Sequence, residues 1–173
     1  MNIPELSPEQ RTALQQIYTE VAADIAQAGP VCDASGRCCR FKEYGHTLFI
    51  SHIEAAFLLE DCPPFPAQND GAGCPFQIEG LCTARSNRPL GCRVYYCDPN
   101  YEETGNAITE KYLQKLKQLS DRENLGWGYA PLHYFLNSEA AQSRATTRKE
   151  PVSPEVLTRQ SLPVIDSPLE ETP

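Results

Sequence analysis

The sequence predicts a mainly α-helical protein: a small, irregular, cysteine-rich domain with little β-structure, in which helices pack around a loop layer. Two observations support this prediction. Apolar residues recur at helical spacing before and after the middle of the chain, and all eight cysteines fall between residues 32 and 97, in a stretch rich in proline and glycine. Long irregular stretches are unusual in compact domains unless a metal or disulfide orders them. The cysteines are therefore expected to hold the loops together.

The first predicted helix spans residues 8–28. Ser7 can cap it, Pro8 suits its first position, and Gln10 completes a capping box. Gly29 and Pro30 end it. Its apolar stripe consists of Leu14, Ile17, Tyr18, Val21 and Ile25.

The cysteine region, residues 31–97, is expected to be loop with two short elements. Residues 46–50 suit a brief strand. Ser51 and Glu54 form a second capping box, which predicts a helix reaching about Glu60.

A third helix is predicted from about 106 to 122, because Ile108, Tyr112, Leu116 and Leu119 share one stripe. Residues 127–136 suit a strand or buried loop. The composition then changes, with prolines and no aromatic residue from 143 onward. We therefore predict one cysteine-cluster domain over residues 1–137 and a disordered tail over 138–173.

The charge balance excludes some functions. The formal net charge of −8 gives no basic surplus for phosphate backbones, so we expect no nucleic-acid partner. No signal peptide or membrane-length apolar run is evident, which predicts a cytoplasmic protein without a membrane partner. Thiols stay reduced in the cytoplasm, where clustered cysteines indicate metal binding or redox chemistry before disulfides.

Seven of the eight cysteines fall into two groups, which we predict to be metal ligands: Cys32, Cys38, Cys39, Cys74, Cys82, Cys92 and Cys97. Soft thiolates bind zinc or the irons of an iron–sulfur cluster, and the spacings do not distinguish the two. Cys38 and Cys39 are adjacent, so their side chains diverge unless the backbone kinks. That arrangement, and the surplus of thiols over four, slightly favours iron–sulfur or a two-ion site. The isolated Cys62 is expected to be a buried apolar residue.

Other side chains near the cysteines have two readings. Arg37, Arg40, Arg85, Arg88 and Arg93 could offset thiolate charge or simply be solvated surface residues.

The three histidines are weaker candidates for metal ligands than the cysteines. His46 and His52 could supply imidazole, but capping or surface positions explain them better, and His133 suits packing.

The second cysteine group carries a family resemblance. Cys74-Pro75-Phe76, Gly80-Leu81-Cys82 and Arg88-Pro89-Leu90-Gly91-Cys92-Arg93-Val94-Tyr95-Tyr96-Cys97 match a CPF…G.C…RP..CR.Y.C pattern. This stretch resembles the YkgJ-like cysteine-cluster family, described as zinc- or iron-chelating and named for a CxxCxxCC motif. The resemblance covers residues 32–97 and implies chelation by the seven cysteines. The family's second cysteine falls on Ser35, whose hydroxyl is a poor substitute for a thiolate.

These observations predict a metal-binding protein whose cofactor is Zn or an Fe–S cluster, with the biological role left open. One alternative is a metal-dependent enzyme or an electron-transfer protein. Glu43, His46, His52 and Glu54 are its acid–base candidates, but no spacing marks a catalytic set, so no residue is predicted as catalytic. The other alternative is an adaptor or metal-delivery module with an unidentified protein partner.

Overall fold

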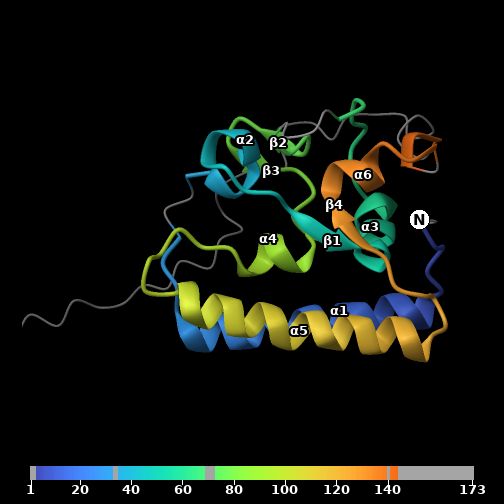
Figure 1. The fold of residues 1–173 in the computed structure, drawn as a ribbon, viewed down its shortest axis with the longest axis horizontal. Helices are drawn as coiled ribbons and strands as arrows, with labels where there is room; N and C mark the ends of the chain where they lie inside the picture. Colours follow the sequence, from blue (N-terminus) through green and yellow to red (C-terminus); the bar gives the residue numbers. More distant parts are fainter. Residues whose placement is uncertain (1–2, 33–34, 69–72, 140, 144–173) are drawn as a thin grey trace, which may run out of the picture.

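The computed structural model describes residues 3–32, 35–68, 73–139 and 141–143. As predicted, the fold is mainly α, with two small two-stranded sheets. Figure 1 shows three levels: a pair of long helices at the base, a middle level of short elements, and the cysteine-bearing turns above.

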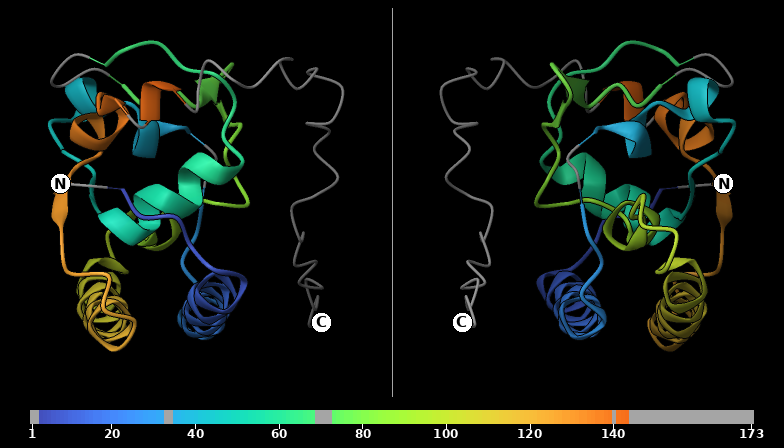
Figure 2. Two further views of the ribbon diagram at one scale, coloured as in Figure 1. Left: turned by 90° about the vertical axis from the view of Figure 1, so that its right-hand side faces the viewer. Right: turned by 90° about the vertical axis from the view of Figure 1, so that its left-hand side faces the viewer.

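The base is formed by α1 (Pro8–Ala28) and α5 (Glu102–Arg122), each of 21 residues. They run antiparallel and side by side, as the end-on views in Figure 2 show. The Ser7–Gln10 capping box of α1 is present, and Gly29 ends the helix in the left-handed region at φ 63°. Helix α5 begins four residues earlier than predicted, with Glu102 and Glu103 in its first turn, where acidic side chains favour the helix dipole.

The middle level contains α3 (His52–Glu60), which begins at the predicted capping box. Every residue from His52 to Leu59 is buried, so this helix lies inside the molecule. It follows β1 (Phe49–Ser51), which pairs antiparallel with β4 (Tyr129–Pro131), and β4 leads into α6 (Leu132–Leu136). The stretch predicted as strand or buried loop therefore contains a strand and a short helix.

The remaining elements are short, and four of the cysteines lie on them: Cys38, Cys39, Cys82 and Cys92. These elements are the 3₁₀ turn η1 (Arg37–Cys39), α2 (Phe41–Tyr44), the hairpin strands β2 (Gln77–Ile78) and β3 (Leu81–Cys82), and α4 (Leu90–Val94). Helix α4 packs against both long helices. The loop layer is thus attached to the helical base through one short helix.

The buried side chains form two clusters. One joins α1, α4 and α5 and includes Leu14, Val21, Tyr112 and Leu116. The other surrounds α3, α6 and the cysteine hairpin, and contains Cys62 at 3% exposure, as expected for a buried apolar cysteine.

Buried packing continues to Ala141, which is fully buried. Most of the predicted tail, from residue 144 on, lies outside the described residues. No helix among the described residues is long and apolar enough to cross a membrane.

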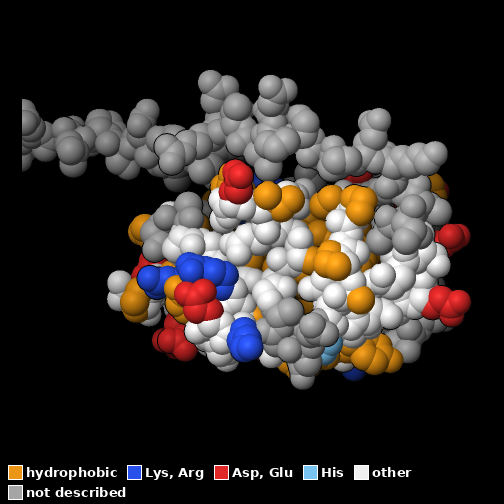
Figure 3. Space-filling view, turned by 90° about the horizontal axis from the view of Figure 1, so that it is seen from above, with side chains coloured by type: hydrophobic (Ala, Val, Ile, Leu, Met, Phe, Trp, Pro, Cys, Tyr) orange, Lys and Arg blue, Asp and Glu red, His pale blue; other side chains and the backbone are white. Residues whose placement is uncertain are grey.

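The face opposite α1 and α5 exposes apolar side chains (Figure 3). The exposed apolar residues of the protein include Ile78 and Leu81 at the hairpin and Tyr134 on α6, at 53%, 45% and 47% exposure.

Candidate metal centre

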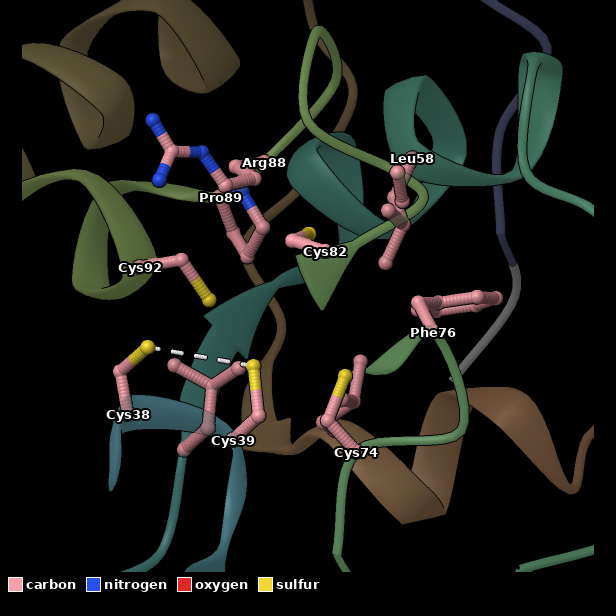
Figure 4. Close-up of a pocket in the computed structure, with 12 residues that line it drawn as sticks. Cys38, Cys39, Leu58, Cys74, Phe76, Cys82, Arg88, Pro89 and Cys92 are labelled. Atoms are coloured by element: carbon pink, nitrogen blue, oxygen red, sulfur yellow. Dashed lines mark hydrogen bonds between the residues drawn. The ribbon is translucent and has the colours of Figure 1, made fainter. Parts of the chain in front are cut away.

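Five of the seven predicted ligands line one small pocket: Cys38, Cys39, Cys74, Cys82 and Cys92. The cavity is about 30 Å³ in volume, and its remaining lining is mostly apolar, including Leu58, Phe76 and Pro89. In Figure 4 the sulfurs of Cys38, Cys39 and Cys92 point toward the same space. The five thiols come from three chain segments, namely η1, the β2–β3 hairpin with its approach, and α4.

Two hydrogen bonds join the first two segments, η1 with its preceding glycine and the approach to the hairpin. The Cys74 backbone N–H donates to the Cys39 carbonyl at 2.7 Å, and the Gln77 side-chain amide donates to the Gly36 carbonyl at 2.9 Å. Gly36 has φ 71°, and a Cβ there would lie 2.5 Å from Gln77 Nε2. A glycine is therefore needed at position 36 both for its conformation and for the approach of the hairpin.

The hairpin brings Cys82 back toward Cys74. Glu79 and Gly80, at φ 51° and 80°, make a two-residue turn with both residues in the left-handed region, as type I′ hairpin turns require. Cys82 then pairs with Gln77, and the Thr83 N–H donates to the Phe76 carbonyl at 2.8 Å.

Helix α4 presents Cys92, and a buried carboxylate holds the start of that helix. Glu54 accepts from the Leu90 N–H at 2.7 Å and from the Tyr18 hydroxyl at 3.2 Å, while its other oxygen accepts from the Ser51 N–H and hydroxyl at 2.8 Å. From the sequence, Glu54 was predicted as part of a capping box and as an acid–base candidate, and not as a partner of α4. Its link to α4 has no local sequence signal, because residues 54 and 90 are far apart in the chain.

Arg93 holds the loop that precedes Cys92. It donates to the carbonyls of Arg88 and Ser86, both at 2.7 Å, and its guanidinium lies 4.0 Å from the centre of the Tyr18 ring. Burial lowers the pKa of Arg93. Arg93 is therefore a packed, half-buried residue and not the solvated surface residue that was one of its two predicted roles.

The sulfurs of Cys38 and Cys39 lie 3.9 Å apart, because η1 supplies the kink that adjacent cysteines require. Two thiolates on one tetrahedral zinc, each at about 2.3 Å, are separated by roughly 3.8 Å. This pair therefore has the spacing of ligands that share one ion. Among the described residues, however, no three His, Cys, Asp or Glu side chains converge closely enough to hold an ion as they stand.

The pocket raises the pKa of four of its thiols, those of Cys38, Cys39, Cys82 and Cys92. At Cys39 the contact from Cys38 lowers the pKa, but the contact with Cys74 and burial raise it to about 12 overall. Burial raises the pKa of Cys82 and Cys92, and the contact with Cys39 followed by burial raises that of Cys38. Of the arginines singled out in the sequence, Arg88 lines the pocket. Its positive charge lowers the pKa of Cys38, Cys82 and Cys92 and so opposes the effect of burial. A bound cation would therefore displace protons from these thiols.

The other two predicted ligands lie outside the pocket lining. Cys32 is exposed, and Cys97 is half-buried with its sulfur 3.7 Å from the Ser35 hydroxyl. The family's second cysteine position thus falls beside Cys97.

The histidine and carboxylate candidates are also elsewhere. His52 is buried, accepts at Nδ1 from the Gly128 N–H at 3.1 Å, and has Nε2 3.1 Å from the Leu125 carbonyl. Glu43 pairs with Arg40 at 3.0 Å on the surface. Neither these residues nor His46 and Glu54 line the thiol pocket.

Comparisons with known proteins add no relative. No family model, curated protein or solved structure matches this chain. The resemblance to cysteine-cluster proteins accordingly stays a prediction based on the residues quoted above.

Proposed function

We propose that this protein binds a metal through cysteine thiolates, as a zinc ion or an iron–sulfur cluster, in the pocket lined by Cys38, Cys39, Cys74, Cys82 and Cys92. The observation that carries the proposal is the meeting of five thiols from three separate segments in one pocket. Chance burial of apolar cysteines would not gather them around one cavity, and Cys62, which packs in the core away from the pocket lining, illustrates that alternative.

The donor set fits a soft metal. Thiolates favour zinc and iron–sulfur clusters, and the Cys38–Cys39 sulfur separation of 3.9 Å suits a shared ion. The sulfurs of Cys74, Cys82 and Cys92 would need to move toward the ion. The short hairpin and loops that carry most of them can shift more readily than long packed helices could. A bound zinc would crosslink the segments, and a cluster would add electron transfer.

The test is metal analysis of paired variants. Protein purified without oxygen would be assayed for zinc, iron and acid-labile sulfide per chain, in the wild type, Cys92→Ser and Cys62→Ser. We expect the wild type and Cys62→Ser to contain metal, and Cys92→Ser to lose most of it.

Two outcomes would contradict the proposal. One is a folded wild-type protein that carries no metal and takes up neither zinc nor iron with sulfide. The other is equal metal content in Cys92→Ser and Cys62→Ser, which would mean that the pocket is not the site.

A further inference from the structure

Three aromatic side chains form a row across the small β1–β4 sheet. Phe49 on β1 and Tyr129 on β4 stack with 5.7 Å between ring centroids, and Tyr129 stacks in turn on Trp127 with 6.2 Å between centroids and 8° between ring planes. Phe49 and Tyr129 are 44% and 41% exposed, and Trp127 is half-buried against the core of the helical base. We call Phe49, Tyr129 and Trp127 the aromatic ladder.

The backbone beneath the ladder is held in place. The pairing of β1 with β4 fixes Phe49 relative to Tyr129. His52 holds Gly128, which lies between the other two ladder residues in the chain: its backbone N–H donates to the Gly128 carbonyl at 2.9 Å, and its ring Nδ1 accepts from the Gly128 N–H at 3.1 Å. A surface held in this way loses little conformational freedom when a ligand binds.

The ladder suits a proline-rich peptide. Exposed aromatic rings are the surfaces on which such peptides bind in the polyproline II conformation. That helix has three residues per turn and rises about 3.1 Å per residue, so prolines three positions apart lie on one side, about 9 Å from each other. The end rings, Phe49 and Trp127, are no further apart than the two ring spacings combined. Stacked nucleobases fit less well, because the net charge of −8 disfavours a phosphate backbone.

The chain itself contains a segment with this spacing. Residues 148–154 read Arg-Lys-Glu-Pro-Val-Ser-Pro, which places Pro151 and Pro154 three positions apart, and they lie outside the described residues. The described chain ends at Ser143, and eight extended residues from there to Pro151 can span up to about 26 Å. Only the short helix α6, which packs against β4, and one further turn separate the sheet from Ser143 (Figure 1). The segment is therefore long enough to return to the ladder.

The charges of the two partners are complementary. Residues 1–143 contain 18 acidic and 11 basic residues, whereas residues 144–149 contain three basic residues and no acidic one. The start of the tail is thus attracted to the domain that precedes it. Close to the ladder, burial, followed by the charges of Glu54 and Glu110, raises the pKa of Tyr129, so negative charge lies within electrostatic range of that ring.

We propose that the aromatic ladder binds proline-rich peptides in the polyproline II conformation, and that its occupant in this protein is the segment of residues 148–154 of the same chain. A segment on a short flexible linker acts at an effective concentration of about 1 mM. Even a peptide with a dissociation constant of about 100 µM would then be docked in about nine copies of ten. A proline-rich segment of another protein would compete with the tail for the ladder.

The experiment uses the fluorescence of Trp127, the only tryptophan of the chain, in the full-length protein. Acrylamide quenching measures how accessible its indole is. Replacing both Pro151 and Pro154 by alanine should raise the quenching constant about twofold or more, because the segment that shields the indole leaves the ladder. The matched control replaces Pro163 and Pro168 by alanine, and its quenching constant should equal that of the wild type.

A second pair of variants tests the ladder side. Phe49→Leu removes an end ring but keeps an apolar side chain, and it should raise the quenching constant as the proline variant does. Tyr134→Leu removes an exposed ring on α6 outside the ladder and should leave the constant unchanged. A synthetic peptide of residues 146–156, added to the variant without Pro151 and Pro154, should lower quenching again. The same peptide with alanine at both proline positions should not.

Three outcomes would overturn the proposal. Equal quenching constants in the wild type and in the variant without Pro151 and Pro154 would mean that the segment does not dock on the ladder. An equal rise in the Pro163 and Pro168 control would mean that residues 148–154 are not the occupant. Shielding that depends on protein concentration would place the tail of a second copy on the ladder. Every variant keeps all eight cysteines, so none of these outcomes bears on the proposed metal site.

Discussion

Ser35 stands where the CxxCxxCC pattern has a cysteine, and its hydroxyl lies beside Cys97. The five pocket thiols do not include this position, so serine there leaves the pocket's donor set complete.

A thiol at position 35 should change the metal stoichiometry. Ser35→Cys would place a thiol beside Cys97, outside the pocket lining, and we expect the variant to retain a second cobalt ion per chain. Equilibrium titration followed by cobalt absorption measures this, with Ser35→Ala as the control that should bind as the wild type does. An unchanged stoichiometry in Ser35→Cys would show that these positions do not converge on one ion.

Glu54 is the residue whose loss should destabilise the fold most among the carboxylates discussed. Its side chain is 2% exposed and accepts from Ser51, Tyr18 and Leu90. Glu54→Ala would leave buried donors unpaired, which we expect to lower the free energy of unfolding by about 3 kcal/mol or more. Glu43→Ala, which removes only a surface ion pair with Arg40, should cost less than about 1 kcal/mol. Urea denaturation of the two variants provides the comparison, and similar losses would contradict the role assigned to Glu54.

At the scale of elements, the helical base is held by apolar packing and by ion pairs such as that of Lys111 with Asp24, and we expect it to need no metal. Leu116 on α5 is fully buried against the α1 side. We expect Leu116→Ala to lower the free energy of unfolding by about 2–5 kcal/mol. Chemical denaturation measures the change, and Leu113→Ala, at a partly buried position of the same helix, should cost less.

Metal removal should affect the elements unequally. In hydrogen exchange, a chelator should release amides of η1, the β2–β3 hairpin and α4, while α1 and α5 stay protected. Uniform loss of protection would mean that the metal supports the whole fold. No change at the hairpin would mean that the pocket does not hold the metal.

The sequence predicted best those elements whose determining residues lie close together in the chain. The helix over 8–28 and the start of α3 were predictable because the cap, the stripe and the stop are adjacent in the chain. The hairpin was missed although Glu79–Gly80 could have indicated a turn, because its strands have only two residues each. Which cysteines line the pocket and which lie outside it depends on contacts between distant parts of the chain. The hydrogen bond of Val31 with Asp98 is one example, and no spacing rule reveals it.

At the scale of the whole molecule, the metal-free protein should lose stability in alkali. The fold raises the pKa of the thiols of Cys38, Cys82 and Cys92, and that of Cys39 from 9.0 to about 12. A thiol of this kind stays protonated in the folded chain while it ionises in the unfolded one. Its contribution to the free energy of unfolding is therefore fully present below about pH 9 and is lost as the pH rises from there toward 12. The decline is at most about 1.4 kcal/mol per pH unit for a fully buried thiol, and less for partly exposed ones.

Urea unfolding of the metal-free protein at several pH values between about 7.5 and 10.5 checks this prediction. Cys39→Ala should show a shallower decline than the wild type. Parallel slopes in Cys39→Ala and the wild type would contradict the prediction.

Helix α4 belongs to both halves of the molecule: Leu90 and Val94 are buried among side chains of the helical base, and Cys92 faces the pocket. A metal that binds the folded pocket and not the unfolded chain stabilises the folded state by its binding free energy. Every segment that unfolds together with α4 gains this stability. The stability of α4 and of the segments that unfold with it would then report the free metal concentration around the protein. A degradation machinery that recognises unfolded chains could in this way distinguish loaded from empty copies without contacting a single thiol.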